Sequence, residues 1–206
     1  MVGVRISNLA HEFDGREVFA SLDFAYNGSC LAITGPNGSG KSTLLRIFSG
    51  LLTPCSGEAT LIVDGEPIPR ERVSSIIGFA APDMRLYAEL STRENLRFLL
   101  RARGASDVEQ HISSALGQVG LENRADDPVS ELSSGLRQRA LLAAAIAHDP
   151  KVLLLDEPSS NLDEAGISML RDLINTWQGR GLVVIATNDS NEAALGSECF
   201  DLRREG

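Results

Sequence analysis

Apolar and polar residues alternate or cluster along the first third of the chain in the manner of β-strands. The segments "VRISNLAHEF", "VFASLDFAY" and "CLAITG" lie between turn signals such as "DG" and "NG", which is typical of short strands joined by tight turns. The next stretch, "GEATLIVDGEPI", predicts a hairpin with an Asp-Gly turn at Asp64–Gly65. We therefore expect the chain to begin with β-structure.

Helical spacing of apolar residues begins after "GKST" and dominates from about residue 91. The first helix is predicted from the apolar residues Leu44, Leu45, Phe48 and Leu51. Ser91 and Glu94 have the spacing of a capping box, so a second helix should start there. "SDVEQHISSALGQVG" predicts an amphipathic helix that ends at a glycine, and "GLRQRALLAAAIAHDP" predicts one that continues to Pro150.

Two continuous apolar runs near the C-terminal end indicate buried parallel strands. They are "KVLLLDEP" and "VVIATNDS", with a further helix predicted near 164–178 between them. The whole pattern predicts a single α/β domain with a parallel-sheet core, an N-terminal antiparallel β-subdomain and an inserted α-helical subdomain. We assign residues 1–82 and 150–206 to the core with its β-subdomain, and 83–149 to the helical insert.

Composition narrows the function classes. The chain has 206 residues, 43% of them hydrophobic and 23% charged, which suits one globular domain. A net charge of -9 argues against nucleic-acid binding, which needs clustered Lys and Arg. The three cysteines are scattered, so neither zinc ligation nor a disulfide framework is expected, and a reduced cytosolic setting fits. There is no signal-peptide pattern, and "ALLAAAIA" is too short to cross a bilayer.

The segment "GPNGSGKS" satisfies the phosphate-binding pattern G-x-x-x-x-G-K-S/T between a predicted strand and helix. Glycines let successive backbone N–H groups surround phosphates, and the helix N-terminus adds positive potential. Lys41 is expected to reach the β- and γ-phosphates of ATP or GTP, Ser42 to ligate Mg²⁺ and Thr43 to bond the α-phosphate. The other loop residues expected to bind nucleotide are Asn37, Gly38, Ser39 and Gly40.

An acidic pair follows the strand of "KVLLLDEPSSNLD". Asp156 is expected beside Mg²⁺, and Glu157 is expected to act as the general base that polarises the attacking water. An acidic pair after a strand is in other proteins often only a helix cap. Downstream of a phosphate-binding loop, and with Pro158 turning the chain, the catalytic interpretation is favoured.

The segment "ELSSGLRQRALLAAAIAHDP" resembles the signature motif, LSGGQ-x-QR, of ATP-binding-cassette (ABC) ATPases. "SSNLD" resembles that family's D-loop, and with "STRENL" and the phosphate-binding loop the resemblance covers essentially the whole chain. It implies that two cassettes pair head to tail, with Ser133 and Gly135 of one chain at the γ-phosphate bound by the other. It also implies that D-loop residue Asp163 contributes to the nucleotide site. Phe13 stands where the family stacks an aromatic residue on adenine, although core packing fits Phe13 nearly as well.

Three regions depart from the family pattern. Pro82 replaces the glutamine that contacts Mg²⁺ and water, and the adjacent Asp83 offers a carboxylate oxygen instead. Within the signature, Ser134 and Leu136 replace the second glycine and the final glutamine. Asn188 occupies the position of the switch histidine that bonds the γ-phosphate, and a neutral amide cannot titrate. Loss of a charge-assisted hydrogen bond, on the order of 1–2 kcal/mol, predicts hydrolysis that is roughly tenfold slower.

Three function classes follow from the resemblance. The leading interpretation is the ATP-hydrolysing subunit of an ABC transporter, a homodimer or heterodimer bound to a separate transmembrane permease at the cytoplasmic face of the membrane. "PDMRLYAEL" lies where the family receives the permease, and the compact length is similar to export-type ATPases such as that of the cytochrome c haem exporter. The alternatives are a nucleotide-binding module with little hydrolysis and a non-transport ABC ATPase.

Overall fold

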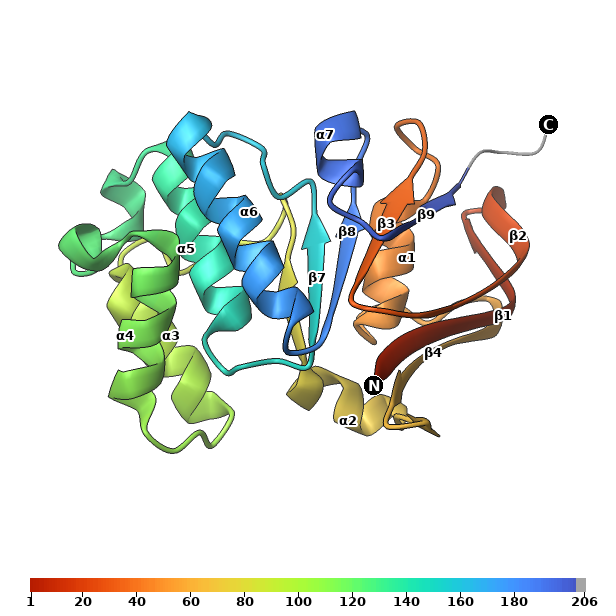
Figure 1. The fold of residues 1–206 in the computed structure, drawn as a ribbon, viewed down its shortest axis with the longest axis horizontal. Coiled ribbons are helices and arrows are strands. Elements are labelled where there is room, and N and C mark those ends of the chain that lie inside the picture. Colours follow the sequence, from red (N-terminus) through yellow and green to blue (C-terminus); the bar gives the residue numbers. More distant parts are fainter. Residues whose placement is uncertain (203–206) are drawn as a thin grey trace.

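The computed structural model describes residues 1–202, whose strands form two sheets. An antiparallel sheet has the order β2-β1-β4-β5, and a five-stranded sheet has the order β6-β7-β8-β3-β9. The antiparallel sheet contains β1 (Val2–Phe13), β2 (Arg16–Asn27), β4 (Ser56–Val63) and β5 (Glu66–Pro67). The second sheet contains β3 (Cys30–Thr34), β6 (Ile77–Ala80), β7 (Val152–Asp156), β8 (Leu182–Ala186) and β9 (Glu198–Asp201). The sheets lie side by side, and most helices lie on the face of the parallel sheet that is turned away from the antiparallel sheet (Figure 1).

The predicted β-rich beginning is confirmed, including the hairpin between β4 and β5. Asp64 and Gly65 both have positive φ, 53° and 87°. Two positive φ angles in a two-residue turn match the twist of the flanking strands, which is why Asp-Gly is favoured there. The buried residues of β1, such as Val4 and Ile6, face the core and alternate with exposed ones.

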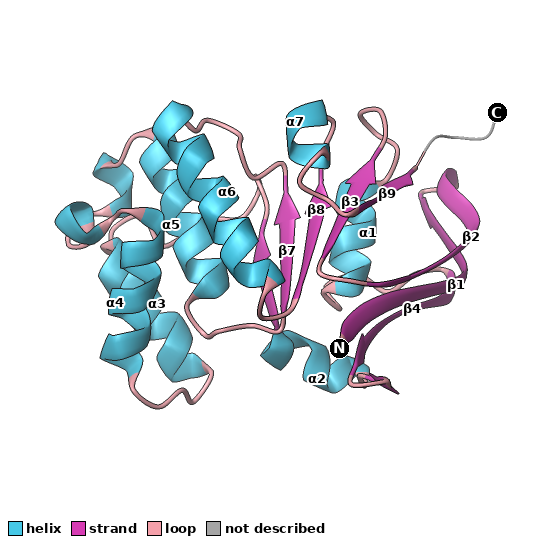
Figure 2. Cartoon of the chain, in the orientation of Figure 1, coloured by secondary structure: helices cyan, strands magenta, loops and turns pink. Residues whose placement is uncertain are grey.

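The parallel sheet is covered on both faces, as the continuous apolar runs predicted (Figure 2). Leu153 and Leu155 of β7 pack into a core with α5 (Ser134–Ile146) and α6 (Glu164–Gln178). The intervening Val152 and Leu154 pack into the opposite core with α1 (Lys41–Phe48). Since successive side chains of a strand point to opposite faces, a strand buried on both sides needs apolar residues throughout.

The segment between β6 and β7 contains α3 (Thr92–Ala102) and α4 (Val108–Val119), which pack with α5. The capping box of α3 is confirmed, because the Ser91 hydroxyl accepts from the Glu94 N–H and the Glu94 carboxylate accepts from the Ser91 N–H. The glycine stop of α4 is also confirmed, since Gly120 has φ of 65°. Two further helices, α2 (Arg70–Ile76) and α7 (Ser190–Ala193), are elements that the apolar pattern did not predict.

Two predicted helix details are wrong. The helix of "GLRQRALLAAAIAHDP" ends at Ile146 rather than continuing to Pro150, and Asp149 has a left-handed φ of 52°. The first helix ends at Phe48, so Leu51 lies beyond it and is 69% exposed. Gly50, with φ of 76°, turns the chain out of the helical path, so Leu51 cannot join the apolar face of the first helix. Over residues 1–202, no helix has the length and apolar character that a membrane crossing requires.

Candidate functional site

The register of the parallel sheet brings the predicted site residues to one edge. Ala186 of β8 pairs with Asp156 of β7 on one side and with Ile33 of β3 on the other. The phosphate-binding loop follows β3, the acidic pair ends β7, and Asn188 lies two residues beyond β8. The arrowheads of β3, β7 and β8 accordingly point to the same edge in Figure 1. In parallel α/β sheets this carboxyl edge is where ligands bind.

The loop between β3 and α1 has a backbone path that only small residues permit. Gly40 has φ of 98°, and a Cβ there would lie 2.6 Å from Val18 Cγ1. Gly35 has φ of 148°, and a Cβ there would lie 2.6 Å from Ser39 Oγ. The glycines at these two ends of the loop are therefore required by backbone conformation and by close packing against the neighbouring side chains.

The N-terminus of α1 and the adjoining loop contain several donors suited to an anion. No side chain caps α1 within the described structure, and its first turn contains no acidic residue. Lys41 is buried, 6% exposed, and its ammonium donates to the carbonyls of Gly35 and Pro36 at 2.8 and 3.1 Å. Ser39 is also buried, and its hydroxyl has no hydrogen-bond partner. A helix N-terminus with uncapped N–H groups, a lysine and an unpartnered hydroxyl is suited to bind an anion.

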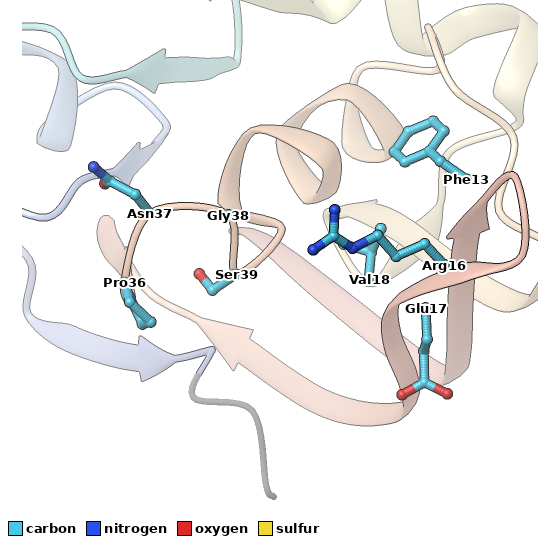
Figure 3. Close-up of a pocket in the computed structure, with 8 residues that line it drawn as sticks. All are labelled: Phe13, Arg16, Glu17, Val18, Pro36, Asn37, Gly38 and Ser39. Atoms are coloured by element: carbon cyan, nitrogen blue, oxygen red, sulfur yellow. The ribbon is translucent and has the colours of Figure 1, made fainter.

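A cavity of about 750 Å³ lies between this loop and the turn that joins β1 to β2 (Figure 3). Its walls are Phe13, Arg16, Glu17 and Val18 on one side and residues 36–39 on the other. Phe13 is 48% exposed, and its ring meets the His11 ring edge-on at 4.6 Å. Phe13 therefore lies at the cavity wall instead of in the core, which was the alternative that the sequence left open.

Asp156 is a buried carboxyl group, 4% exposed, at the end of β7. Burial raises its pKa because the charged form loses hydration, and a hydrogen bond from Ser42 partly opposes this. The sequence expected both residues at one Mg²⁺ site, and the structure brings them into contact. Their oxygen atoms are the hard ligands that Mg²⁺ prefers.

Glu157 adopts an unusual backbone conformation for a residue other than glycine, with φ of 45°. Its N–H donates to the Ala186 carbonyl at 2.9 Å, and its own carbonyl accepts from the Ser160 N–H at 3.1 Å. Left-handed residues of this kind are strained and are often found at active sites. The conformation turns the chain sharply after Asp156, so that two successive carboxylates face different surroundings.

Two side chains at the positions that depart from the family pattern, Asn188 and Asp83, are hydrogen-bonded within the chain. The Asn188 amide donates to the Asn37 side-chain carbonyl at 2.9 Å, which links the end of β8 to the phosphate-binding loop. Asp83 accepts from the Arg46 guanidinium at 2.7 Å in an ion pair with α1. Pro82 is exposed and adds no side-chain acceptor.

The signature residues and Asp163 lie at the N-termini of two helices. The Ser133 hydroxyl caps α5 by accepting from the Leu136 N–H at 3.3 Å. Gly135 lies so close to the turn between β7 and α6 that a Cβ would lie 2.8 Å from the Asn161 carbonyl oxygen. Asp163 caps α6 through the Gly166 N–H at 2.8 Å and pairs with Arg139 at 3.1 Å. The Gly166 N–H bond and the Arg139 charge lower the pKa of the Asp163 carboxyl.

Two sets of site neighbours were missed at the sequence level. Arg16, Glu17 and Val18 line the cavity because Phe13 pairs with Arg16 across a tight turn, and the adjoining "DG" was the available signal. Glu192, in α7, belongs to none of the sequence motifs. Its carboxylate nevertheless accepts a hydrogen bond from Ser159, in the turn that follows Glu157. No local spacing could have shown this contact between residues 33 positions apart.

Comparison with known proteins gives a consistent result. The sequence profile of the family described as ABC transporter matches residues 20–160. Nod factor export ATP-binding protein I of Rhizobium meliloti is 34% identical over 198 residues, which are 94% of this chain and 58% of that protein. Lantibiotic transport ATP-binding protein SrtF of Streptococcus pyogenes is 32% identical, over 90% of this chain and 79% of that protein. The chain thus spans only 58% and 57% of the Nod factor export relatives from two rhizobia.

The fold agrees with solved cassettes. A dimeric ATP-binding cassette in a post-hydrolysis state with ADP and Pi superposes with a TM-score of 0.85 and 26% identity, over 97% of this chain and 94% of that one. That structure, like the present one, combines an antiparallel sheet with a parallel α/β core. The profile match, the relatives and the edge of the sheet described above lead to one conclusion: this chain belongs to the ABC transporter family, as an ATP-binding cassette of the α/β class.

Proposed function

We propose that this chain binds ATP with Mg²⁺ and hydrolyses it to drive transport, as the nucleotide-binding subunit of an ABC transporter. The observation that carries the proposal is the sheet register, which gathers an uncapped phosphate-binding loop, a buried Asp156 and a left-handed Glu157 at one edge of the sheet, where the loop also borders the cavity. Each of these features is costly to a protein that binds nothing there, because it involves strain, a buried charge or unpartnered donors.

ATP fits this site from its base to its phosphates. The Phe13 ring provides an aromatic surface for adenine at the cavity wall. The loop N–H groups and the Ser39 hydroxyl would donate to phosphate oxygens, and Thr43 would do so at the α-phosphate. The Lys41 ammonium, which donates to two loop carbonyls, would exchange these for the β- and γ-phosphates.

Ser42 and Asp156 would hold Mg²⁺. They fit because both present oxygen ligands and because the Asp156 carboxylate is buried without a cationic partner of its own among the described ion pairs. When bound, the cation would neutralise charge on the phosphates and orient them. Asp83 is the further candidate, but its carboxylate would first have to leave Arg46.

Glu157 would act on the attacking water. Its carboxylate would accept a proton from the water as the water oxygen bonds to the γ-phosphorus. The bond between the γ-phosphorus and the bridging oxygen would break, and the electron pair of that bond would stay on the ADP oxygen. Asn188 would donate to a γ-phosphate oxygen after exchanging its bond to Asn37. Since the amide is neutral and Pro82 supplies no polar group, we propose slow hydrolysis, roughly tenfold below a cassette with the usual histidine.

A second cassette would complete the site. None of the residues that line the cavity comes from the signature segment, and Ser134 lines a different hollow beside Asn161. Ser133 and Gly135 would therefore bind the γ-phosphate held by a partner, with Asp163 in the adjoining D-loop. The dimeric solved cassette supports pairing. Homodimer and heterodimer are both compatible with this arrangement.

A separate transmembrane permease would dock on the helical side, at the cytoplasmic face of the membrane. We propose that residues 83–149 act as the subdomain that carries the signature helix and receives this partner. The supporting observation is a hollow of about 250 Å³ bordered by Met84, Leu86 and Leu99. The residues adjoining Leu86 and Leu99 in sequence, Tyr87 and Phe98, are exposed, and their rings meet edge-on at 5.5 Å. Exposed apolar side chains around a hollow are typical of a protein-binding surface.

A nucleotide-binding module with little hydrolysis is the second candidate. It is favoured by the two contacts that would have to break, Asn188 to Asn37 and Asp83 to Arg46. ATP turnover should be measured for the purified wild type, Glu157→Gln and Asn188→His, with dimerisation followed by light scattering. We expect measurable wild-type turnover, faster turnover in Asn188→His, and ATP-dependent dimers without turnover in Glu157→Gln. Wild-type binding without turnover would select the second candidate, and unchanged turnover in Glu157→Gln would exclude Glu157 as the base.

A further inference from the structure

Glu192 is a buried carboxylate that the proposed mechanism does not use. It belongs to α7, which follows β8 at the carboxyl edge of the sheet, and it is only 5% exposed. Its Oε1 accepts a hydrogen bond from the backbone N–H of Ser159 at 2.7 Å. Burying a carboxylate is unfavourable unless it is hydrogen-bonded, so this contact indicates a specific role for the side chain.

Ser159 lies in the turn that places Glu157. At one end of this turn the Glu157 N–H is bonded to the Ala186 carbonyl, and inside it the Ser160 N–H is bonded to the Glu157 carbonyl. Neither bond fixes the peptide between Pro158 and Ser159. Two side chains hold this peptide: the Gln138 amide donates to the Pro158 carbonyl at 3.1 Å, and the Glu192 carboxylate is the acceptor for the Ser159 N–H. Because Glu157 is left-handed, its conformation persists only while the surrounding bonds hold the turn.

The backbone of Glu192 is itself firmly anchored. Asp189 caps α7 by accepting from the N–H groups of Asn191 and Glu192, at 2.6 and 3.4 Å. Just after α7, Gly196 packs so closely on β3 that a Cβ would lie 2.8 Å from the Ala32 Cβ. The carboxylate thus extends from a segment fixed to β3 and β8 across to the turn that leaves β7.

We propose that Glu192 is a positioning residue that holds the Glu157 turn in its catalytic geometry. This inference rests on the proposed ATPase function. Without the carboxylate, the Ser159 N–H loses its acceptor, the turn relaxes, and Glu157 no longer points consistently at the attacking water. The phosphate-binding loop follows β3 and makes no contact with Glu192 among the described hydrogen bonds, so nucleotide binding should be preserved.

The test compares Glu192→Ala, Glu192→Gln and, as a control, Glu198→Ala, which removes an exposed carboxylate from β9. Steady-state ATPase kinetics and amide hydrogen exchange at Ser159 are measured on the full chain. We expect kcat to fall about tenfold in Glu192→Ala with KM unchanged within about twofold, as loss of one hydrogen bond to a charged group predicts. Glu192→Gln keeps an acceptor oxygen and should restore most of kcat and the Ser159 protection. The control should behave as the wild type.

The outcomes separate this inference from the proposed function. Normal kcat in Glu192→Ala despite lost Ser159 protection would overturn the positioning role while leaving the ATPase proposal intact. A parallel fall of kcat in Glu192→Ala and Glu192→Gln, or a rise in KM as large as the fall in kcat, would also overturn it. A wild type that binds ATP without hydrolysing it would refute the ATPase function, and the positioning role with it. If Glu192→Ala does not fold, Glu192→Asp, whose carboxylate is one methylene too short, replaces it with the same expectations.

Discussion

Replacing Asp156 with Asn should make the ligand-free protein more stable while removing its response to Mg–ATP. Asp156 is 4% exposed, and burial raises the pKa of its carboxyl above the ordinary value. At neutral pH the ionised group is therefore a cost to the folded state. Asparagine has the same shape, carries no charge and keeps an oxygen that can accept from Ser42.

The size of the effect follows from the surroundings of Asp156. An imperfectly compensated buried group costs about 1–3 kcal/mol, and the hydrogen bond from Ser42 offsets part of this. We expect Asp156→Asn to gain about 1 kcal/mol in the free energy of unfolding. For a chain of this length that corresponds to a rise in Tm of about 2–4 °C.

The gain should depend on pH with a definite sign. A raised pKa means that the folded protein holds the Asp156 proton to a higher pH than the unfolded chain does. Between these two pKa values the folded state binds more protons, so wild-type stability falls as pH rises. The difference between Asp156→Asn and wild type should therefore be small at acidic pH, below the ordinary carboxyl range, and should open as pH rises through the folded-state pKa.

The assay is thermal unfolding followed by circular dichroism between pH 2 and pH 8, first without Mg²⁺ and nucleotide and then with both. Asp163→Asn is the matched control, because the pKa of Asp163 is lowered by the Gly166 N–H and by Arg139. That variant should be less stable than wild type at neutral pH, with the difference disappearing as pH falls through the folded-state pKa. A lower Tm for Asp156→Asn at neutral pH, or a gain that does not vary with pH, would refute the reasoning. Added Mg–ATP should raise the Tm of wild type but not that of Asp156→Asn.

Three further results are expected. Ser91→Ala removes the hydroxyl that accepts from the Glu94 N–H in the α3 capping box, and should lower the free energy of unfolding by about 1 kcal/mol in urea titration. An unchanged urea midpoint would contradict the stabilising role of this cap. Burial raises the pKa of the Cys30 thiol to about 11. Iodoacetamide at pH 8 should therefore label the exposed Cys199 much faster than Cys30 in the folded protein. Equal labelling rates would show that Cys30 is accessible. Gly135→Ala places a Cβ 2.8 Å from the Asn161 carbonyl and should cost about 1–3 kcal/mol by chemical denaturation, whereas a neutral effect would mean that this contact yields without strain.

Local chemistry made much of this protein predictable. A capping box spans three residues, a two-residue turn selects Asp-Gly, and a phosphate-binding loop needs glycines at fixed spacing, so each is contained in a short stretch of sequence. Buried parallel strands have apolar residues on both faces, which is why β7 and β8 were predicted from their continuous apolar runs. Spacing also identified Lys41, Asp156 and Glu157 as candidate site residues, whose catalytic roles stay predictions.

Errors occurred where local signals competed. Apolar spacing extended the first helix to Leu51, but Gly50 ended it earlier by turning the chain. The helix beginning at Ser134 was extended to Pro150, but it ends at Ile146 and Asp149 turns left-handed. Helix propensity is a weak preference, and backbone reversals needed to reach the next strand override it.

The sequence by itself determined most of the strands and longer helices, which loop can surround phosphates and which carboxylates end a strand, because each depends on residues a few positions apart. Only the tertiary structure decided that Asn188 bonds to Asn37, that Asp83 is held by Arg46 and that Glu192 supports the turn after Glu157. These contacts join residues 33 to 151 positions apart. Their partners are chosen by the register of the parallel sheet, which sets β8 between β3 and β7 and so brings three distant chain segments to one edge.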